Sequence, residues 1–312
     1  MINFFVEQVQ KNGLNVNSIM ITQDDKTSEF FFNSDTPCSL RSISKVISCL
    51  GVHLAMKSGM FDLDTLVMSF FKDIKITNEK NIEPLNHLKI RHLLNLTIGH
   101  EYALMFSKDL AKLPTETNLL EYVLNYDIRH LPGEYFVYNN AATYILSAII
   151  QRQTGMNFSE WIKNKIFNPL NITKFKWENS PQGICLGASG LFLCNKDLHK
   201  IAKLLLRKGM TENGNQLIEE SWVEDISTPK VLTANLPEYI NKQDRSLNKM
   251  AYGYHLWICG DGSATYPKTH YFVDGTDGQF LIMVPPKNMT ITILSNQKDM
   301  NPLYPLFDEF VM

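Results

Sequence analysis

Strand-like segments lie near both ends of this 312-residue sequence, and helical patterning fills the long stretch between them. Near the start, residues 18–22 and 29–33 are rich in β-branched and aromatic residues and flank a polar turn. Four more strand-like segments fall between 253 and 295, and residues 302–310 resemble a closing helix. From about 62 to 176 most segments have helical or loop-like patterns. The two ends of the chain therefore have to supply the strands.

This order of elements predicts one antiparallel sheet, flanked by helices, with an all-helical subdomain inserted between its strands. We expect a mixed α+β fold. Residues 1–60 and 180–312 are predicted to form a discontinuous sheet domain, and residues 61–179 the helical subdomain. The active site is expected at their interface.

The composition narrows the possible partners. The net charge is −2 and both signs are mixed along the chain, which argues against nucleic acid. The longest apolar runs, residues 145–150 and 280–285, are too short to span a bilayer, and residues 1–11 lack the features of a signal peptide. The five scattered cysteines suit reduced thiols in a cytoplasmic protein. Neither cysteines nor histidines have metal-site spacing, so we expect no metal and no cofactor.

Ser-x-x-Lys is the first candidate catalytic motif, but it is short and occurs five times. The copies are Ser42/Lys45, Ser69/Lys72, Ser227/Lys230, Ser246/Lys249 and Ser295/Lys298. Sequence context favours the first, because the apolar pattern of residues 46–56 places it at the start of a buried helix. Of the others, the Ser227 copy contains a proline and the Ser246 copy lies in a polar segment. Ser295 is at a strand end, and Lys72 of the Ser69 copy is next to an aspartate. We therefore predict Ser42 as a nucleophile.

Lys45 can act on Ser42 because residues three apart share one face of a helix. The helix N-terminus favours negative charge developing on the hydroxyl. Apolar surroundings would lower the pKa of the lysine ammonium and leave an amine that can take the hydroxyl proton. The pair predicts a serine hydrolase that forms a covalent acyl-enzyme.

Tyr138-x-Asn140 is the second candidate motif, on a loop between a Pro-Gly turn and an apolar helix. The phenol could relay a proton, and the amide, which has both a donor and an acceptor, could donate to a substrate carbonyl group. A competing Tyr239-x-Asn241 lies in residues 235–249, a polar segment that we interpret as a surface loop. We therefore favour Tyr138 and Asn140 as partners of the nucleophile.

Taken in order, the motifs resemble those of the serine β-lactamase and penicillin-binding-protein superfamily, in its class C-like branch. That branch includes esterases, D-amino-acid peptidases and 6-aminohexanoate-dimer hydrolases. The resemblance covers nearly the whole chain and rests on LRSISK (40–45), IRHLLNLTIG (90–99), PGEYFVYNN (132–140) and ASGL with the following KDL (188–198). It implies a β-lactamase/transpeptidase-like fold in which Ser42 attacks, Lys45 and Tyr138 move protons, and Asn140 helps to hold the substrate.

The chain departs from the family pattern at the third motif, usually Lys or His, then Thr or Ser, then Gly. Val273, Asp274 and Gly275 stand there. The retained Gly275 implies that the backbone N–H of Thr276 pairs with that of Ser42 as an oxyanion hole, where one donor is typically worth about 10²–10³ in rate. Because Val273 is neutral and Asp274 would repel an anion, we expect weak or no β-lactamase activity. A small neutral or amine-bearing ester, amide or peptide is the expected substrate.

Two other functions stay open: a D-Ala-D-Ala carboxypeptidase or β-lactamase, and a catalytically weak penicillin-binding-like sensor or interaction module. An α/β-hydrolase is disfavoured because residues 187–191 match Gly-x-Ser-x-Gly only in part. A nucleotide-binding enzyme is disfavoured for want of a phosphate-binding glycine loop. We interpret His255, Cys49 and the four tryptophans as structural residues, and we leave the oligomeric state open.

Overall fold

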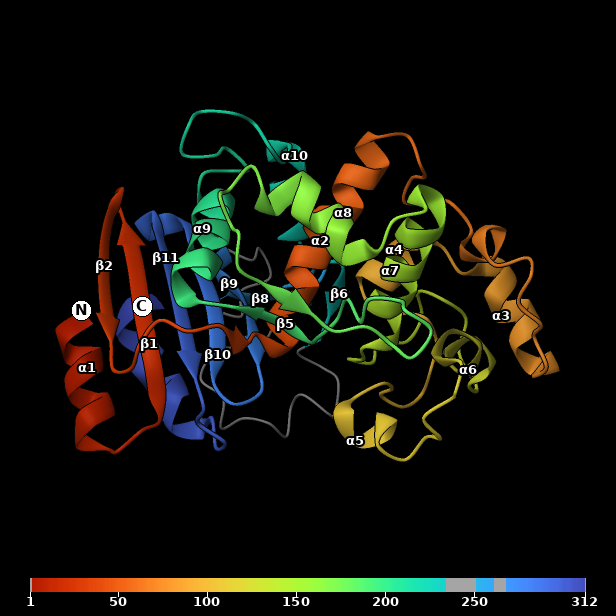
Figure 1. The fold of residues 1–312 in the computed structure, drawn as a ribbon, viewed down its shortest axis with the longest axis horizontal. Coiled ribbons are helices and arrows are strands. Elements are labelled where there is room, and N and C mark those ends of the chain that lie inside the picture. The colour runs from red at the N-terminus through yellow and green to blue at the C-terminus, as the bar shows by residue number, and fades with distance from the viewer. Residues whose placement is uncertain (1, 234–250, 261–267, 312) are drawn as a thin grey trace.

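The computed structural model describes residues 2–233, 251–260 and 268–311. Its centre is an eight-stranded antiparallel sheet in the order β2-β1-β11-β10-β9-β8-β7-β6 (Figure 1). The strands are β1 (Val16–Gln23), β2 (Lys26–Phe31), β6 (Val231–Leu232), β7 (Ala251–Tyr252), β8 (Trp257–Gly260), β9 (Lys268–Gly275), β10 (Gln279–Val284) and β11 (Met289–Ser295). β1 pairs with β11, so strands from both ends of the chain lie side by side. The predicted α+β fold with an antiparallel sheet flanked by helices is confirmed.

One face of the sheet is covered by helices from the two ends of the chain. These are α1 (Ile2–Lys11), the 3₁₀ helix η6 (Asn301–Phe307) and the short α12 (Asp308–Val311). The rings of Phe5 and Phe307 stack 6.3 Å apart between centroids, and both side chains are fully buried. This aromatic cluster holds the closing segment against the strands.

The opposite face is covered by α9 (Asn195–Leu206). Its buried His199 hydrogen-bonds with the hydroxyl of Thr22 on β1 and with that of Thr292 on β11, each at 2.8 Å. These two buried hydrogen bonds thus connect α9, whose apolar residues recur at helical spacing, to two neighbouring strands.

The helical block lies to one side of the sheet (Figure 1). Its helices are α2 (Ser44–Lys57), α3 (Ile82–His87), α4 (Ile90–Leu94), α5 (Ser107–Leu110), α6 (Leu119–Asn125), α7 (Ala141–Thr154), α8 (Phe158–Ile162) and α10 (Glu220–Ile226), with η2 (Val67–Phe70), η3 (Glu79–Asn81) and the π-helical η4 (Lys163–Phe167). Residues 44–55 of α2 and 141–150 of α7 are buried all around. Such helices belong in the interior of the molecule.

A second, three-stranded sheet was not predicted. It consists of β3 (Cys38–Ser39), β5 (Leu191–Leu193) and β4 (Lys176–Trp177), in the order β3-β5-β4. The next backbone N–H, that of Leu40, donates to the carbonyl of Leu191 at 2.8 Å. Strands of two or three residues carry too little alternation to be recognised in a sequence. This small sheet fixes the chain directly before Ser42.

The strand predicted from 253 to 259 is wrong in its first half. β7 ends at Tyr252 and β8 begins at Trp257, because the residues between them form a turn in which the Gly253 N–H donates to the Leu256 carbonyl. His255 has a φ of 60° in this turn, which no strand accommodates. The polar segment 235–249 and its Tyr239-x-Asn241 lie outside the described residues.

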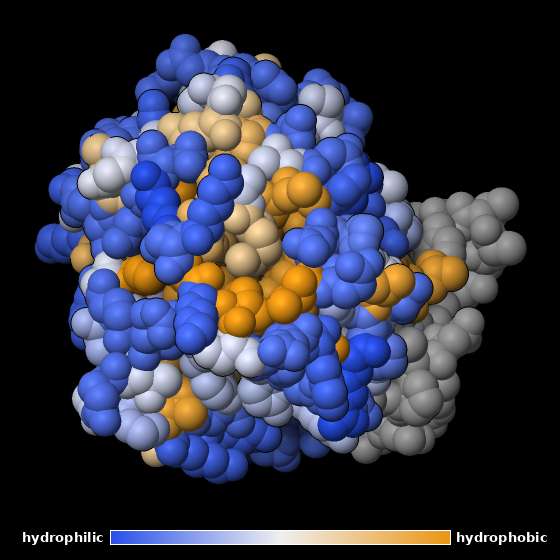
Figure 2. Space-filling model, turned by 90° about the vertical axis from the view of Figure 1, so that its right-hand side faces the viewer, coloured by the Kyte–Doolittle hydropathy of each residue, from blue (hydrophilic) through white to orange (hydrophobic). Residues whose placement is uncertain are grey.

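The surface of the helical block is mainly polar, with apolar side chains gathered in a band across the middle of the face shown in Figure 2. Ile82, at the start of α3, is one of the exposed apolar residues of the chain. Within the described residues, no helix combines the length and the apolar character needed to cross a bilayer. The five cysteines, all within the described residues, are not joined in disulfides.

Candidate active site

Ser42 lies in a tight turn between β3 and α2. The turn is the 3₁₀ helix η1 (Arg41–Ile43), and the Ser44 hydroxyl donates to the Arg41 carbonyl at 2.7 Å. α2 begins only at Ser44, so Ser42 lies just before the N-terminus of the helix and not within it. Its side chain is half-buried and remains accessible.

Lys45 reaches back over one turn to Ser42. Its Nζ lies 3.1 Å from the Ser42 Oγ, and it donates to Oδ1 of Asn140 at 2.6 Å and to the Ala188 carbonyl at 3.4 Å. The lysine side chain is completely buried. Two oxygens from two other segments, those of Asn140 and Ala188, thus hold the amine beside the Ser42 hydroxyl.

Burial determines the protonation of Lys45. Loss of solvation disfavours the ammonium and lowers its pKa to about 7, while the carboxylate of Asp274 acts in the opposite direction and raises it. Near neutral pH a substantial fraction of the molecules therefore carries an uncharged amine. An amine of this pKa within hydrogen-bond distance of a serine hydroxyl is suited to act as a general base.

Asn140 is free to face Lys45 because its neighbour caps the helix. Oδ1 of Asn139 accepts the N–H of Ala142 at 2.9 Å, which satisfies the first turn of α7. The Asn140 side chain instead donates to the Met105 carbonyl at 2.9 Å and accepts from Lys45. The amide orientation is therefore fixed at both ends.

The ring of Tyr138 lies over Lys45, with 4.8 Å between Nζ and the ring centroid. It stacks on Trp257 of β8 at 5.6 Å and on Phe106 at 6.4 Å. These rings hold the phenol in one orientation, half-buried at the edge of the site. Ser42, Lys45, Tyr138 and Asn140 are therefore brought together.

Gly275 lets the end of β9 approach the nucleophile turn closely. A Cβ at this position would lie 2.7 Å from the Leu40 carbonyl oxygen and 2.7 Å from the Arg41 Cβ. Any other residue would push β9 and η1 apart. Thr276 follows in an exposed turn between β9 and β10, next to this contact.

Asp274 and Val273 point into the protein interior. The Asp274 side chain is buried and accepts a hydrogen bond from the Tyr304 hydroxyl of η6 at 2.7 Å, and Val273 is 2% exposed. The third-motif position therefore carries a buried carboxylate that influences Lys45 electrostatically. Among the described residues, no group of His, Cys, Asp or Glu side chains could hold a metal ion.

A model of the Beta-lactamase family matches residues 3–306. The chain belongs to the beta-lactamase family. This confirms the resemblance to the serine β-lactamase and penicillin-binding-protein superfamily that the motifs carry. As a family member, the chain is a relative of serine hydrolases.

Two curated relatives illustrate the breadth of the beta-lactamase family. Penicillin-binding protein 4* of Bacillus subtilis is 27% identical over 46% of this chain and 32% of its own length. Monacolin J acid methylbutanoyltransferase of Aspergillus terreus is 25% identical over 47% of this chain and 40% of its own length. The matches thus span well under half of these relatives.

Solved structures share the fold over almost the entire chain. One from Bacillus anthracis, provisionally assigned as a 6-aminohexanoate-dimer hydrolase, has a TM-score of 0.75 at 20% identity and covers 97% of this chain and 79% of its own. A penicillin-binding protein from Bacillus halodurans has a TM-score of 0.73 at 16% identity, covering 98% and 99%. At these identities the likeness concerns the fold.

In the other described Ser-x-x-Lys copies of this beta-lactamase-family chain, the serine hydroxyls donate hydrogen bonds to backbone carbonyls. The hydroxyls of Ser69, Ser227 and Ser295 donate to the backbone carbonyls of Leu66, Val223 and Asn15, respectively. Ser246 lies outside the described residues. Among the described copies, hydrogen bonding between the serine and its lysine is found at Ser42.

Sequence reasoning missed the two backbone carbonyls that orient Lys45 and Asn140, those of Ala188 and Met105. Gly187, directly before the ASGL motif that begins at Ala188, is a local signal for the first. It has a φ of 65° and a Cβ there would lie 3.0 Å from the Thr143 carbonyl oxygen, so glycine lets this loop pack on α7. Every residue has a backbone carbonyl, so the sequence alone does not reveal which of them faces the site.

His255, which we interpret as a structural residue, lies close enough to the site for the Lys45 charge to act on its ring. Its ring is buried, and Nε2 is 3.3 Å from the Thr143 hydroxyl. Burial, with a smaller contribution from the Lys45 charge, lowers the pKa of His255 to about 3. The ring is therefore neutral when Lys45 titrates.

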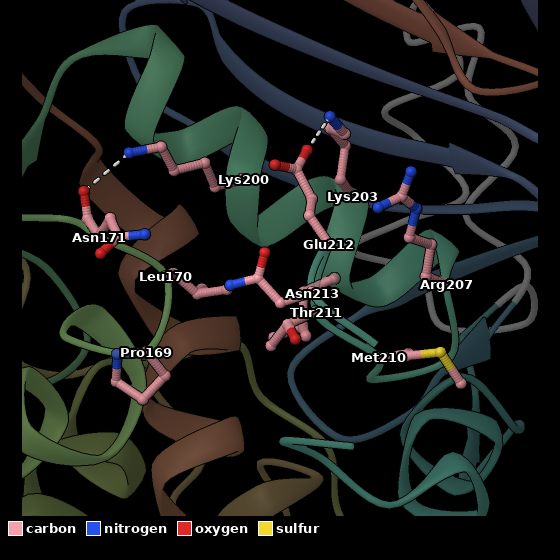
Figure 3. A pocket seen from close by; sticks show the side chains of 11 residues that line it. Pro169, Leu170, Asn171, Lys200, Lys203, Arg207, Met210, Thr211, Glu212 and Asn213 are labelled. Atoms are coloured by element: carbon pink, nitrogen blue, oxygen red, sulfur yellow. Dashed lines mark hydrogen bonds and ion pairs between the residues drawn. The ribbon is translucent and has the colours of Figure 1, made fainter. Parts of the chain in front are cut away.

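A separate pocket lies beside α9 and carries several basic side chains (Figure 3). Each is paired: Lys200 with Asp197 and the Asn171 carbonyl, Lys203 with Glu212, and Arg207 with Asp25. The positive charges are neutralised by carboxylates, and the residues that line the pocket include no serine–lysine pair. Ser42, Lys45, Tyr138 and Asn140 are not among the residues that line this pocket.

Proposed function

We propose that this chain is a serine hydrolase that forms an acyl-enzyme on Ser42, with Lys45 as general base. The observation that carries the proposal is the 3.1 Å contact between the Ser42 Oγ and the buried Lys45 Nζ. The lowered pKa of this lysine supports it. We place the site between the sheet domain (1–60 and 180–312) and the helical subdomain (61–179).

Acylation begins when the Lys45 amine takes the Ser42 proton as Oγ attacks the substrate carbonyl carbon. The resulting oxyanion accepts hydrogen bonds from the backbone N–H groups of Ser42 and Thr276. Collapse of this intermediate breaks the bond to the leaving group, which receives the proton from the Lys45 ammonium, directly or through the Tyr138 hydroxyl. An ester on Ser42 remains.

Deacylation repeats the sequence with water as the nucleophile. Water gives one proton to the base, adds to the acyl carbon and expels the Ser42 oxygen, which regains a proton from Lys45. The products are a free acid and the original enzyme. Asn140 orients Lys45 and offers its amide to the substrate, and the cycle uses no cofactor.

The proposed substrate is a small neutral or amine-bearing ester, amide or peptide. Val273 and the buried Asp274 supply no cation to bind a substrate carboxylate, so penicillins and D-Ala-D-Ala peptides are expected to react poorly. Acyl-enzyme chemistry also fits the relatives, since one is a penicillin-binding protein and another a methylbutanoyltransferase by name. A weak sensor-like acylation is the second candidate, favoured by the same third motif.

Mass spectrometry of the intact protein tests the proposal. After incubation with p-nitrophenyl esters, we expect an acyl adduct on the wild type that is absent in Ser42→Ala, and strongly reduced labelling in Lys45→Met. A fluorescent penicillin should label weakly. Adducts without turnover would favour the sensor, and strong penicillin labelling without ester turnover would favour the carboxypeptidase or β-lactamase.

Circular dichroism and urea unfolding provide the control, because Ser42→Ala should keep the wild-type fold. Unchanged ester turnover in a folded Ser42→Ala protein would contradict the proposed function.

A further inference from the structure

We propose that the ion pair between Arg41 and Asp277 is a positioning device that sets the spacing of the two oxyanion-hole donors. The inference rests on the proposed function, because it concerns the N–H groups of Ser42 and Thr276. Neither Arg41 nor Asp277 has to touch the substrate. Their proposed role is to hold two backbone segments together.

The two residues of the pair adjoin the two donors in the sequence. Arg41 directly precedes Ser42, and Asp277 directly follows Thr276. Arg41 Nη2 lies 2.6 Å from Asp277 Oδ2, across 236 positions of sequence. A single short contact therefore connects the nucleophile turn with the turn that follows β9.

Both residues have left-handed backbone conformations, with φ of 52° at Arg41 and 67° at Asp277. Residues with a Cβ rarely adopt such angles, and they persist only where the surroundings hold them. The backbone angles on either side of a peptide group set the direction in which its N–H points. The ion pair joins the two strained positions, so it restrains both donors at once.

Close packing and the ion pair act at the same junction. Gly275 permits the approach of β9 to Arg41, since a Cβ there would lie 2.7 Å from the Arg41 Cβ. The side chains of Arg41 and Asp277 bridge the same junction from outside, and Asp277 is only 15% exposed. The Arg41 side chain is 40% exposed, so the shielding from solvent is confined to the carboxylate side of the pair.

Asp277 is itself held by the sheet. The Gln279 side chain is 2% exposed, and its Nε2 donates to the Asp277 carbonyl at 3.3 Å and to the Ser295 carbonyl of β11 at 2.5 Å. Arg41 is thereby connected, through Asp277, to the centre of the sheet. Through these contacts the sheet helps to fix the position of Ser42.

Lys298 also contacts Asp277, at 3.0 Å, but its side chain is 83% exposed and it belongs to neither donor segment. A solvated lysine of this kind contributes little. It therefore offers a control at the same carboxylate.

The test compares steady-state kinetics of Arg41→Ala with wild type on a p-nitrophenyl ester. Alanine keeps a Cβ, so the conformational demand at φ 52° is retained while the side chain beyond Cβ is removed together with its ion pair. We expect kcat to fall about tenfold or more with KM within twofold, a part of the roughly 10²–10³ that deletion of a whole donor costs. Affinity for an arylboronic acid, which forms a tetrahedral adduct on serine, should fall by a similar factor.

Three further variants complete the experiment. Arg41→Lys should recover part of the lost kcat, and Arg41→Ala combined with Asp277→Ala should be no slower than the slower single variant. Lys298→Ala should behave as wild type. Arg152→Ala removes an arginine of similar exposure that pairs with Asp73, so it controls for loss of a surface arginine.

The inference is overturned if folded Arg41→Ala keeps wild-type kcat and boronate affinity, or if only KM rises. It is also overturned if Lys298→Ala loses as much kcat as Arg41→Ala. The proposed function fails separately, through turnover that survives Ser42→Ala. The two failures are therefore distinguishable.

Discussion

Lys45 shows how one residue combines burial and charge. Removal from water lowers its pKa to about 7, and Asp274 limits how far the pKa falls. A carboxylate at the third-motif position thus acts on the pKa of the proposed base. Tyr304 of the closing segment donates a hydrogen bond to Asp274. The closing segment is therefore linked indirectly, through this carboxylate, to the pKa of Lys45.

The pH profile of ester hydrolysis should report this balance. Acylation needs the uncharged amine, so kcat/KM is expected to rise with pH and level off above a pKa near 7. Asp274→Asn removes the charge that raises this pKa but keeps an acceptor for Tyr304. The rising limb of the profile should therefore move to lower pH.

The control for this prediction is Asp64→Asn, a surface carboxylate paired with Lys89 and Arg91. It should leave the profile in place. A limb that moves to higher pH in Asp274→Asn, or that stays fixed, would contradict the proposed electrostatic role.

At the scale of elements, the site depends on how closely β9 approaches η1. The contact is made at Gly275, where there is no room for a side chain. Strand β9 carries the glycine and the small β3–β5–β4 sheet holds the other partner, so two sheets meet at the nucleophile.

Gly275→Ala should lower the free energy of unfolding by about 1–3 kcal/mol, the usual cost of overpacking. It should reduce kcat much more, since a displacement of about 1 Å at a reacting group can cost about 10²-fold. Gly13→Ala is the matched control. It is strained by a φ of 62° but meets no atom within 4 Å, so it should lose stability without loss of kcat. Urea unfolding and ester kinetics measure both effects; equal kcat in the two variants would refute the prediction.

Much of the architecture could be predicted because its signals are local. Strands β10 and β11 and the Ser42–Lys45 spacing depend on patterns within a few residues. Tyr138 and Asn140 could be chosen through the turn and helix that flank them, together with the order of the motifs. The carbonyl of Ala188 and the turn at His255 depend on how distant segments pack, which no short pattern encodes.

At the scale of the whole molecule, several histidines are buried as neutral rings. Burial lowers the pKa of His199 and His255 to about 3 and that of His100 and His270 to about 4. In the unfolded chain these groups titrate near 6.5. Between these values the unfolded state binds more protons than the folded state, so stability falls as pH falls.

We expect the free energy of unfolding to decrease from pH 7 to pH 5, by at most about 2 kcal/mol for each such histidine. His199→Gln should reduce stability at pH 7, because Thr22 and Thr292 lose a shared partner, but should flatten the pH dependence. Urea midpoints at the two pH values measure this. His87→Gln on the exposed surface of α3 should keep the wild-type slope, and a His199→Gln slope as steep as wild type would argue against the assignment.

The pairing of β1 with β11 has a consequence for biosynthesis. A ribosome releases the β1–β2 hairpin long before residues 289–295 are translated, yet those residues are the inner neighbour of β1. Until then, β1 presents an open strand edge, which readily pairs with other chains. Nascent chains arrested before β11 should therefore aggregate or depend on chaperones, and the proposed esterase activity should emerge only after the last strand has been synthesised.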